Sequence, residues 1–202
     1  MGRFEDTERL RQQIAQEAAR LIHDQGIQDF RQAKMKAAAR LMGGGRAALP
    51  TNTEIEAALI AHQALFGADA HSERIHELRR CALMAMDLLE NFSPRLVGPV
   101  LAGTAASNSP VNLHVFSDTP ENVLWCVEAS GRTVASFERR LKNRRDTASC
   151  LYPGYRFIVD ETSVEATVFA FDGLRQAPIS PVDGKPMQRA SKARVVALTN
   201  GG

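Results

Sequence analysis

Cysteine is scarce in this sequence and too widely spread to define a site. Only three cysteines occur among 202 residues: Cys81, Cys126 and Cys150. This odd number and these long separations exclude a disulfide framework and leave no Cys-x-x-Cys pair for a metal or a redox reaction. The chain therefore fits a reducing compartment, and we expect it to be cytoplasmic.

Long apolar runs are also missing. No stretch approaches the roughly 18 apolar residues that a membrane-spanning helix requires. The N-terminus becomes acidic at Glu5 and Asp6 before the apolar core of a signal peptide could form. Asp6 also stands where an N-myristoylation motif needs Ser or Thr. We expect no membrane partner.

Charge of one sign is not in excess, and aromatic residues are few. The chain has 25 Lys and Arg against 23 Asp and Glu, a net charge of +2, and 6% aromatic residues. Nucleic-acid-binding proteins concentrate basic residues on one face, so this sum neither requires nor excludes such a partner. Hydrophobic residues make up 44% of the chain, which is enough to bury a core.

The first half of the sequence is predicted to be helical. Apolar residues recur at helical spacing from residue 7 to residue 92, and the pattern divides into four helices at about 7–26, 29–42, 51–66 and 72–91. The run Thr51-Asn52-Thr53-Glu54 has the spacing of a capping box, which predicts the start of the third helix.

The histidines of this half do not form a recognisable metal motif. His62 shares the apolar face of the third predicted helix, so we interpret it as a residue at the edge of the core and not as a ligand. His71 and His76 are five residues apart, which places them on different sides of a helix. The sequence alone therefore predicts no zinc site.

In the second half, the period of the apolar pattern changes from 3.6 to 2 near residues 93–96. We therefore predict an α+β protein in which a helical domain, residues 1–93, precedes a mixed β-sheet domain, residues 94–202. Strands are expected at 97–101, 111–116, 133–141, 155–160 and 164–171, with a hairpin turn at 160–163. Thr119 is expected to cap a helix that begins at Pro120, residues 176–186 form a turn-rich tail, and a short helix is expected at 189–198.

A small-residue turn between the first two expected strands carries a resemblance. The segment Leu101-Ala102-Gly103-Thr104, followed by Ser107, Ser109 and Val111-Asn112-Leu113-His114, resembles a divergent form of the signature of the nucleotidyltransferase superfamily, which includes polymerase beta and small bacterial nucleotidyltransferases. The resemblance covers about residues 96–172. It implies that Gly103, Thr104, Ser107 and Ser109 approach the phosphates of a nucleotide through their backbone amides.

The same resemblance implies a metal site that this sequence lacks. In that superfamily two carboxylates on one strand, with a third on a later strand, hold Mg²⁺. Here the paired positions are Pro110 and Asn112, or Asn112 and His114, and only the later carboxylate is present, as Glu165. Mg²⁺ is therefore expected only if the chain is active, with Asp118 or Asp160 completing the site. We interpret the chain as a degenerate enzyme that binds a nucleotide or a phosphate-bearing partner through these residues.

A basic run follows the predicted helix of the second domain. It consists of Arg132, Arg139, Arg140, Lys142, Arg144 and Arg145. Arg140 and Lys142 are expected to hold phosphates of a nucleotide or an RNA, with Phe137, Tyr152 and Tyr155 as the candidates for base stacking. Simpler interpretations stay open: a solvated basic loop, a turn without a ligand, Asn112 and His114 as polar residues at the core edge, and Glu165 as an exposed sheet residue.

A second resemblance suggests a different function. Residues 14–26 are similar to the first helix of TetR-type DNA-binding regulators, although residues 43–50 intervene where those regulators continue with a compact turn and a recognition helix. The resemblance to these regulators implies that the helical domain contacts DNA or a protein partner. The alternative to a nucleotide-binding protein is therefore a non-enzymatic interaction or regulatory protein.

Overall fold

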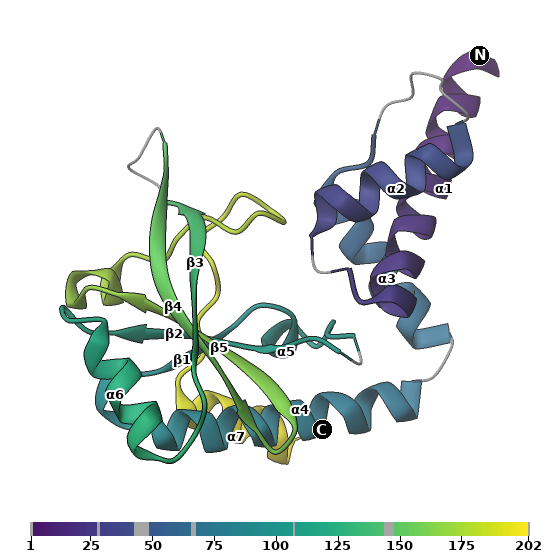
Figure 1. Cartoon of the computed structure of the whole chain (residues 1–202). Coiled ribbons are helices and arrows are strands. Elements are labelled where there is room, and N and C mark those ends of the chain that lie inside the picture. The colour runs from purple at the N-terminus through teal and green to yellow at the C-terminus, as the bar shows by residue number, and fades with distance from the viewer. Residues whose placement is uncertain are drawn as a thin grey trace. The chain divides into compact units, whose positions relative to one another are not determined.

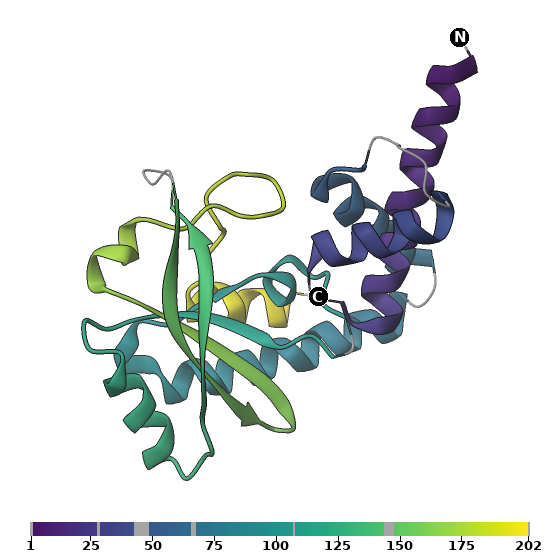
Figure 2. The ribbon, with the colours of Figure 1, turned by 45° about the horizontal axis from the view of Figure 1, so that its top comes forward.

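The chain is a mixed α+β protein in which most helices precede a five-stranded sheet (Figure 1). The computed structural model describes residues 2–27, 29–42, 49–65, 68–106, 108–143 and 148–201. Figure 2 shows the same elements from a second side. In the described part of the chain, no helix combines the length and the apolar character needed to cross a membrane.

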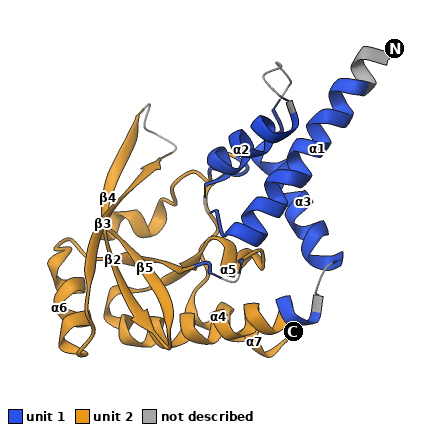
Figure 3. Cartoon of the chain, turned by 45° about the vertical axis from the view of Figure 1, so that its right-hand side comes forward, with its two compact units in different colours: residues 1–71, 106–109, 181–183 blue, residues 72–105, 110–180, 184–202 orange. Residues whose placement is uncertain are grey.

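The structure divides into two compact units (Figure 3). Unit 1 contains residues 1–71, 106–109 and 181–183, and unit 2 contains residues 72–105, 110–180 and 184–202. The sequence predicts a domain boundary at 93/94, whereas the main division of the structure falls between His71 and Ser72. The reason is that the long helix before the sheet packs its apolar side against the strands and shares their core.

Unit 1 consists of helices α1 (Gly2–Gln25), α2 (Phe30–Met42) and α3 (Asn52–Leu65), with the first turn of α4 (Ala68–Leu88). These helices match the predicted ranges, except that α1 begins five residues earlier. Small and aliphatic side chains fill the core between them: Ile14, Ala18, Leu21, Ala33, Ala37, Ile55 and Leu59. The alanines allow the helices to approach closely, and most polar residues of each amphipathic pattern remain outside, although Gln63 of α3 is buried.

The predicted capping box is confirmed at the start of α3. The backbone N–H of Glu54 donates to Thr51 Oγ1 at 3.2 Å, and the backbone N–H of Thr51 donates to Glu54 Oε2 at 2.6 Å. Arg11 of α1 also donates to the Glu54 carboxylate at 2.8 Å. Hydrogen bonds from Arg11, and then from Thr51, lower the pKa of Glu54 to about 2. The cap therefore stays ionised at neutral pH and joins α3 to α1.

Replacing Thr51 by Val should lower the free energy of unfolding of the helical unit by about 1 kcal/mol, because the hydroxyl that accepts from Glu54 N–H is lost. Urea denaturation followed by far-UV circular dichroism measures the change. Thr53→Val is the matched control, since Thr53 is exposed on the same helix turn. Equal losses in the two variants would show that the exchange of a hydroxyl for a methyl group, and not the cap, is responsible.

Unit 2 is built on a sheet with the strand order β1-β2-β5-β4-β3. The strands are β1 (Arg95–Val97), β2 (Val111–Phe116), β3 (Ala135–Lys142), β4 (Ser149–Val159) and β5 (Thr162–Phe169). β2 and β5 are parallel, and all other neighbours are antiparallel. The remaining elements are the short helices η1 (Glu90–Phe92), α5 (Pro99–Ala102) and η2 (Phe171–Arg175), and the longer helices α6 (Glu121–Ala129) and α7 (Lys192–Asn200).

Helices α4, α6 and α7 provide the core on one face of this sheet. Apolar side chains of the three helices join alternate residues of the strands in one cluster: Leu78, Ala82, Ala85, Leu89, Val123, Val127, Val195, Leu113, Val115, Phe157, Val164 and Val168. Because side chains alternate along a strand, the residues between these strand positions all point to the other face. Most of the polar side chains that could form a functional site lie on this second face.

Two local predictions differ from the structure. The strand expected at 97–101 ends at Val97, because Gly98 has φ +72° and turns the chain into α5. Thr119 does not cap α6 with its side chain: Pro120 is the N-cap residue, and the helix begins at Glu121. Instead, the Thr119 N–H donates to Ser117 Oγ.

The hairpin predicted at 160–163 is confirmed. Asp160 and Glu161 both have positive φ, +43° and +64°, which is the backbone of the two-residue type I′ turn that matches strand twist. This turn fixes the register of β4 on β5 and places Arg156 directly opposite Glu165. The register therefore determines that a positive and a negative side chain meet on this part of the sheet.

Candidate functional site

The candidate site is the face of the sheet that points away from α4, α6 and α7. We call it the arginine face. It comprises Asn112 and His114 of β2, Phe137 and Arg139 of β3, Tyr152 and Arg156 of β4, Glu165, Thr167 and Phe169 of β5, and Arg189, which follows the strands in the sequence. The ladders pair Asn112 with Glu165 and His114 with Thr167. Arg139 is paired with Tyr152, and Arg156 with Glu165.

Glu165 lies at the centre of this face, between two arginines. Its Oε1 accepts hydrogen bonds from Nε and Nη2 of Arg156, at 2.9 and 2.6 Å, and its Oε2 accepts a short one from Nη2 of Arg139. Nη1 of Arg139 also donates to Asn112 Oδ1 at 2.8 Å. The Glu165 side chain is only 6% exposed. Both oxygens of the carboxylate are therefore used by guanidinium groups.

Phe137 and Gly154 keep the two arginines in place. The Phe137 ring lies over Gly154 on the neighbouring strand, where a Cβ would come within 2.3 Å of a ring carbon. The guanidinium carbons of Arg139 and Arg156 lie 5.2 and 5.7 Å from the centre of the same ring, within the range of cation–π attraction. Only glycine at position 154 allows this arrangement.

His114 is buried beside this group. It is 1% exposed, and its Nδ1 accepts a hydrogen bond from Arg189 Nε at 3.0 Å. Burial, followed by the positive charges of Arg189 and Arg139, lowers the pKa of His114 well below 6.5. The imidazole is therefore neutral, with its proton on Nε2. Nε2 is buried and has no hydrogen-bond partner among the described residues.

Arg189 brings a third guanidinium to the face. Its charged group lies 5.1 Å from the centre of the Phe116 ring and 5.0 Å from that of Phe169, and Nη1 donates to the carbonyl of Gly173 at 2.6 Å. Burial, followed by the charge of Arg95, lowers the pKa of Arg189 to about 10. Arg189 thus remains charged at neutral pH, yet its buried Nη2 has no hydrogen-bond partner in the described part of the chain.

The sequence-predicted residues fall into three groups. Asn112, His114 and Glu165 come together on the arginine face, as the alternation of the strands and the resemblance predict. Arg140 and Lys142 do not join them: both are exposed, and they alternate with Arg139 along β3, so they point to the other side.

The glycine turn forms the third group. Gly103 has φ +80°, which confirms the bend, and the Thr104 N–H donates to the carbonyl of Pro99. Farther along the loop, the Ala106 N–H donates to Ser109 Oγ and the Ser109 N–H donates to the carbonyl of Ala106. Ser107 lies outside the described residues, as do Arg144 and Arg145. These backbone amides are used inside the loop, and not held out toward a phosphate as expected.

Sequence reasoning does not find four residues of the face. The sequence places Arg139 in the basic run, although its alternation with Arg140 along the strand separates the two. Arg156 and Thr167 carry no signal in the sequence, because their place depends on which strands pair and in which register. Arg189 lies 20 residues beyond β5 and reaches the site only through the path of the final segment.

The residues present do not fit the Mg²⁺ site that the resemblance implies. Both Glu165 oxygens and the Asn112 oxygen accept from arginines, and His114 Nδ1 accepts from Arg189. Mg²⁺ requires free anionic oxygens, and nearby guanidinium groups repel it. Asp118 follows the C-terminal end of β2, whereas Asp160 precedes the N-terminal end of the parallel strand β5. The two aspartates therefore lie beyond opposite ends of the sheet, and neither completes a site with Glu165.

Comparison of the chain with protein-family models, with curated proteins and with solved structures finds no match.

Proposed function

We propose that this chain binds a nucleotide or another phosphate-bearing partner on the arginine face, and that it is a divergent nucleotidyltransferase-like protein without transferase activity. The observation that carries the proposal is the excess of guanidinium over carboxylate. Arg139, Arg156 and Arg189 share the face with a single acidic residue, Glu165, while His114 is neutral. A face with this surplus of positive charge attracts anions.

The chemistry of the face suits a phosphate. Guanidinium groups bind phosphate oxygens through paired N–H donors, and this geometry is more specific than a point charge. Half of the Arg156 side chain is exposed, so it can turn from Glu165 to a ligand. Tyr152 is partly exposed and provides aromatic surface next to the arginines for a base, with its ring centre 4.6 Å from that of the buried Phe169.

The resemblance and the sheet topology support the same proposal. The positions that would hold the carboxylates of a nucleotidyltransferase, Asn112, His114 and Glu165, are neighbours on parallel strands. In this chain arginine contacts replace the metal at these positions. We therefore expect that the chain binds its ligand without Mg²⁺.

Thermal-shift titration with nucleoside triphosphates and with inorganic triphosphate, each with and without Mg²⁺, tests the proposal. We expect stabilisation without metal and no increase when Mg²⁺ is added. Arg156→Gln should remove most of the shift, measured from that variant's own melting temperature. Arg140→Gln, an exposed arginine on the other side of the sheet, should keep it. Stabilisation only with Mg²⁺ would support an active transferase, and no response would contradict a nucleotide ligand.

Helix α2 favours DNA binding as a second candidate. It contains Arg31, Lys34, Lys36 and Arg40 and no acidic residue. Binding of this kind would weaken steeply with salt, because each phosphate contact releases counterions. A gel-shift titration with duplex DNA at low and high salt, repeated with Arg31→Gln, separates this function from nucleotide binding.

A further inference from the structure

Two histidines and an aspartate meet in unit 1. His23 and Asp24 belong to the last turn of α1, and His62 belongs to the last turn of α3. One ligand atom from each residue, a ring nitrogen or a carboxylate oxygen, lies within 4.8 Å of the other two. The two imidazole rings meet edge to face, with centres 5.1 Å apart and planes at 70°.

These separations are close to those of a bound metal. Ligand atoms in a tetrahedral zinc site, with bonds of roughly 2.0–2.1 Å, lie about 3.4 Å from one another. Small rotations of partly exposed side chains would therefore bring the three atoms onto one ion. Two imidazole nitrogens and one carboxylate oxygen favour Zn²⁺, Co²⁺ or Ni²⁺ over Mg²⁺, which prefers oxygen ligands alone.

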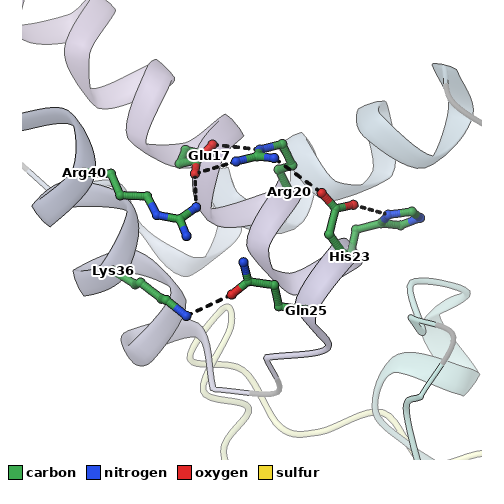
Figure 4. Close-up of polar contacts among 7 residues, drawn as sticks. Glu17, Arg20, His23, Gln25, Lys36 and Arg40 are labelled. Atoms are coloured by element: carbon green, nitrogen blue, oxygen red, sulfur yellow. Dashed lines mark hydrogen bonds and ion pairs between the residues drawn. The ribbon is translucent and has the colours of Figure 1, made fainter.

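The local electrostatics also favour a cation. Helices α1 and α3 end at Gln25 and Leu65, and the C-terminal end of a helix carries partial negative charge on its unpaired carbonyls. Asp24 adds a full negative charge. Arg20 opposes the binding of a cation, because its positively charged Nη1 lies 3.6 Å from Asp24 Oδ2. Figure 4 follows this network of polar contacts from Arg40 through Glu17 and Arg20 to His23.

We infer that His23, Asp24 and His62 form a binding site for a divalent transition metal of the zinc class, with water completing the coordination. The ion replaces the contact between His23 Nδ1 and Asp24 Oδ1, which are 3.0 Å apart, and links the end of α1 to the end of α3. Metal binding therefore stabilises the helical unit. The site is independent of the phosphate-binding function proposed for unit 2.

Isothermal titration of the full chain with Zn²⁺ tests this inference, and Co²⁺ provides a visible spectrum that reports its coordination. We expect one site, an absorption band typical of nitrogen-ligated Co²⁺, and no response to Mg²⁺. His23→Gln and His62→Gln should each lower the affinity by at least the roughly 10- to 100-fold that loss of a supporting partner costs in metal sites. His76→Gln is the matched control, because His76 is an exposed histidine of unit 2.

A fourth variant tests the direction of the electrostatic argument. Arg20→Gln removes the cation beside Asp24 and should tighten Zn²⁺ binding several-fold, whereas Asp24→Asn should weaken it. Circular dichroism confirms that each variant remains helical. The inference is overturned if the wild-type chain does not bind Zn²⁺, if His76→Gln loses as much affinity as His62→Gln, or if the two ligand variants bind as tightly as the wild type.

Discussion

Replacing Glu165 by Gln should lower the free energy of unfolding of unit 2 by about 2–3 kcal/mol, because Arg139 and Arg156 would keep their charges without a carboxylate between them. Removing one partner of a buried ion pair is costly, since the remaining charge stays away from water. The value lies below that of a fully buried pair because half of the Arg156 side chain is exposed. Chemical denaturation, followed by the fluorescence of the single tryptophan Trp125, measures the loss.

The control for this variant is Glu138→Gln. Glu138 is an exposed residue of β3 that alternates with Arg139, so its replacement should change stability by less than about 0.5 kcal/mol. A double variant, Glu165→Gln with Arg139→Gln, should lose less than the sum of the single changes, because the stranded charge is removed with its partner. An increase in stability in Glu165→Gln would contradict this account, because it would show that burying the charged carboxylate costs more than its contacts with Arg139 and Arg156 return.

Glu165 also shows where sequence reasoning succeeds and where it stops. Alternation along residues 111–116 correctly places Asn112 and His114 on one face, and the parallel pairing of β2 with β5 places Glu165 opposite Asn112. Nothing local in the sequence indicates that Arg156 lies opposite Glu165. That pairing depends on the type I′ turn at Asp160 and Glu161, and a register shift of one residue would send Arg156 to the other face.

In the helical unit, too, the local structure is predictable from the sequence and the long-range contacts are not. The start of α3 follows from four consecutive residues, Thr51 to Glu54, because a capping box is a local structure. His62 is placed correctly at the edge of the helical unit by its spacing. Its approach to His23 was not predictable, because it arises from the packing of α1 on α3 across 39 residues of sequence. A site that forms where two distant helices pack can be recognised only once the fold is known.

The stability of unit 2 should fall as the pH drops from 7.5 to 5.5, and His114 alone should contribute on the order of 1 kcal/mol to this loss. In the folded chain, burial and the charges of Arg189 and Arg139 hold the pKa of His114 well below 6.5. In the unfolded chain the imidazole regains its ordinary pKa and takes up a proton below pH 6.5. The unfolded state thus binds more protons in this range, so its free energy falls relative to that of the folded state.

Comparing the pH dependence of stability in the wild type and in a His114 variant separates the effect of His114 from that of the other titrating groups. His114→Asn keeps an acceptor for Arg189 Nε but has no proton to gain, so its unfolding free energy should depend less steeply on pH between 7.5 and 5.5. His76→Gln, which removes an exposed histidine, should retain the wild-type slope. If His114→Asn and the wild type lose stability in parallel, His114 takes up its proton over the same pH range in the folded state as in the unfolded state. Its Nδ1 could then no longer accept from Arg189, and the arginine face would carry one positive charge more than the structure indicates.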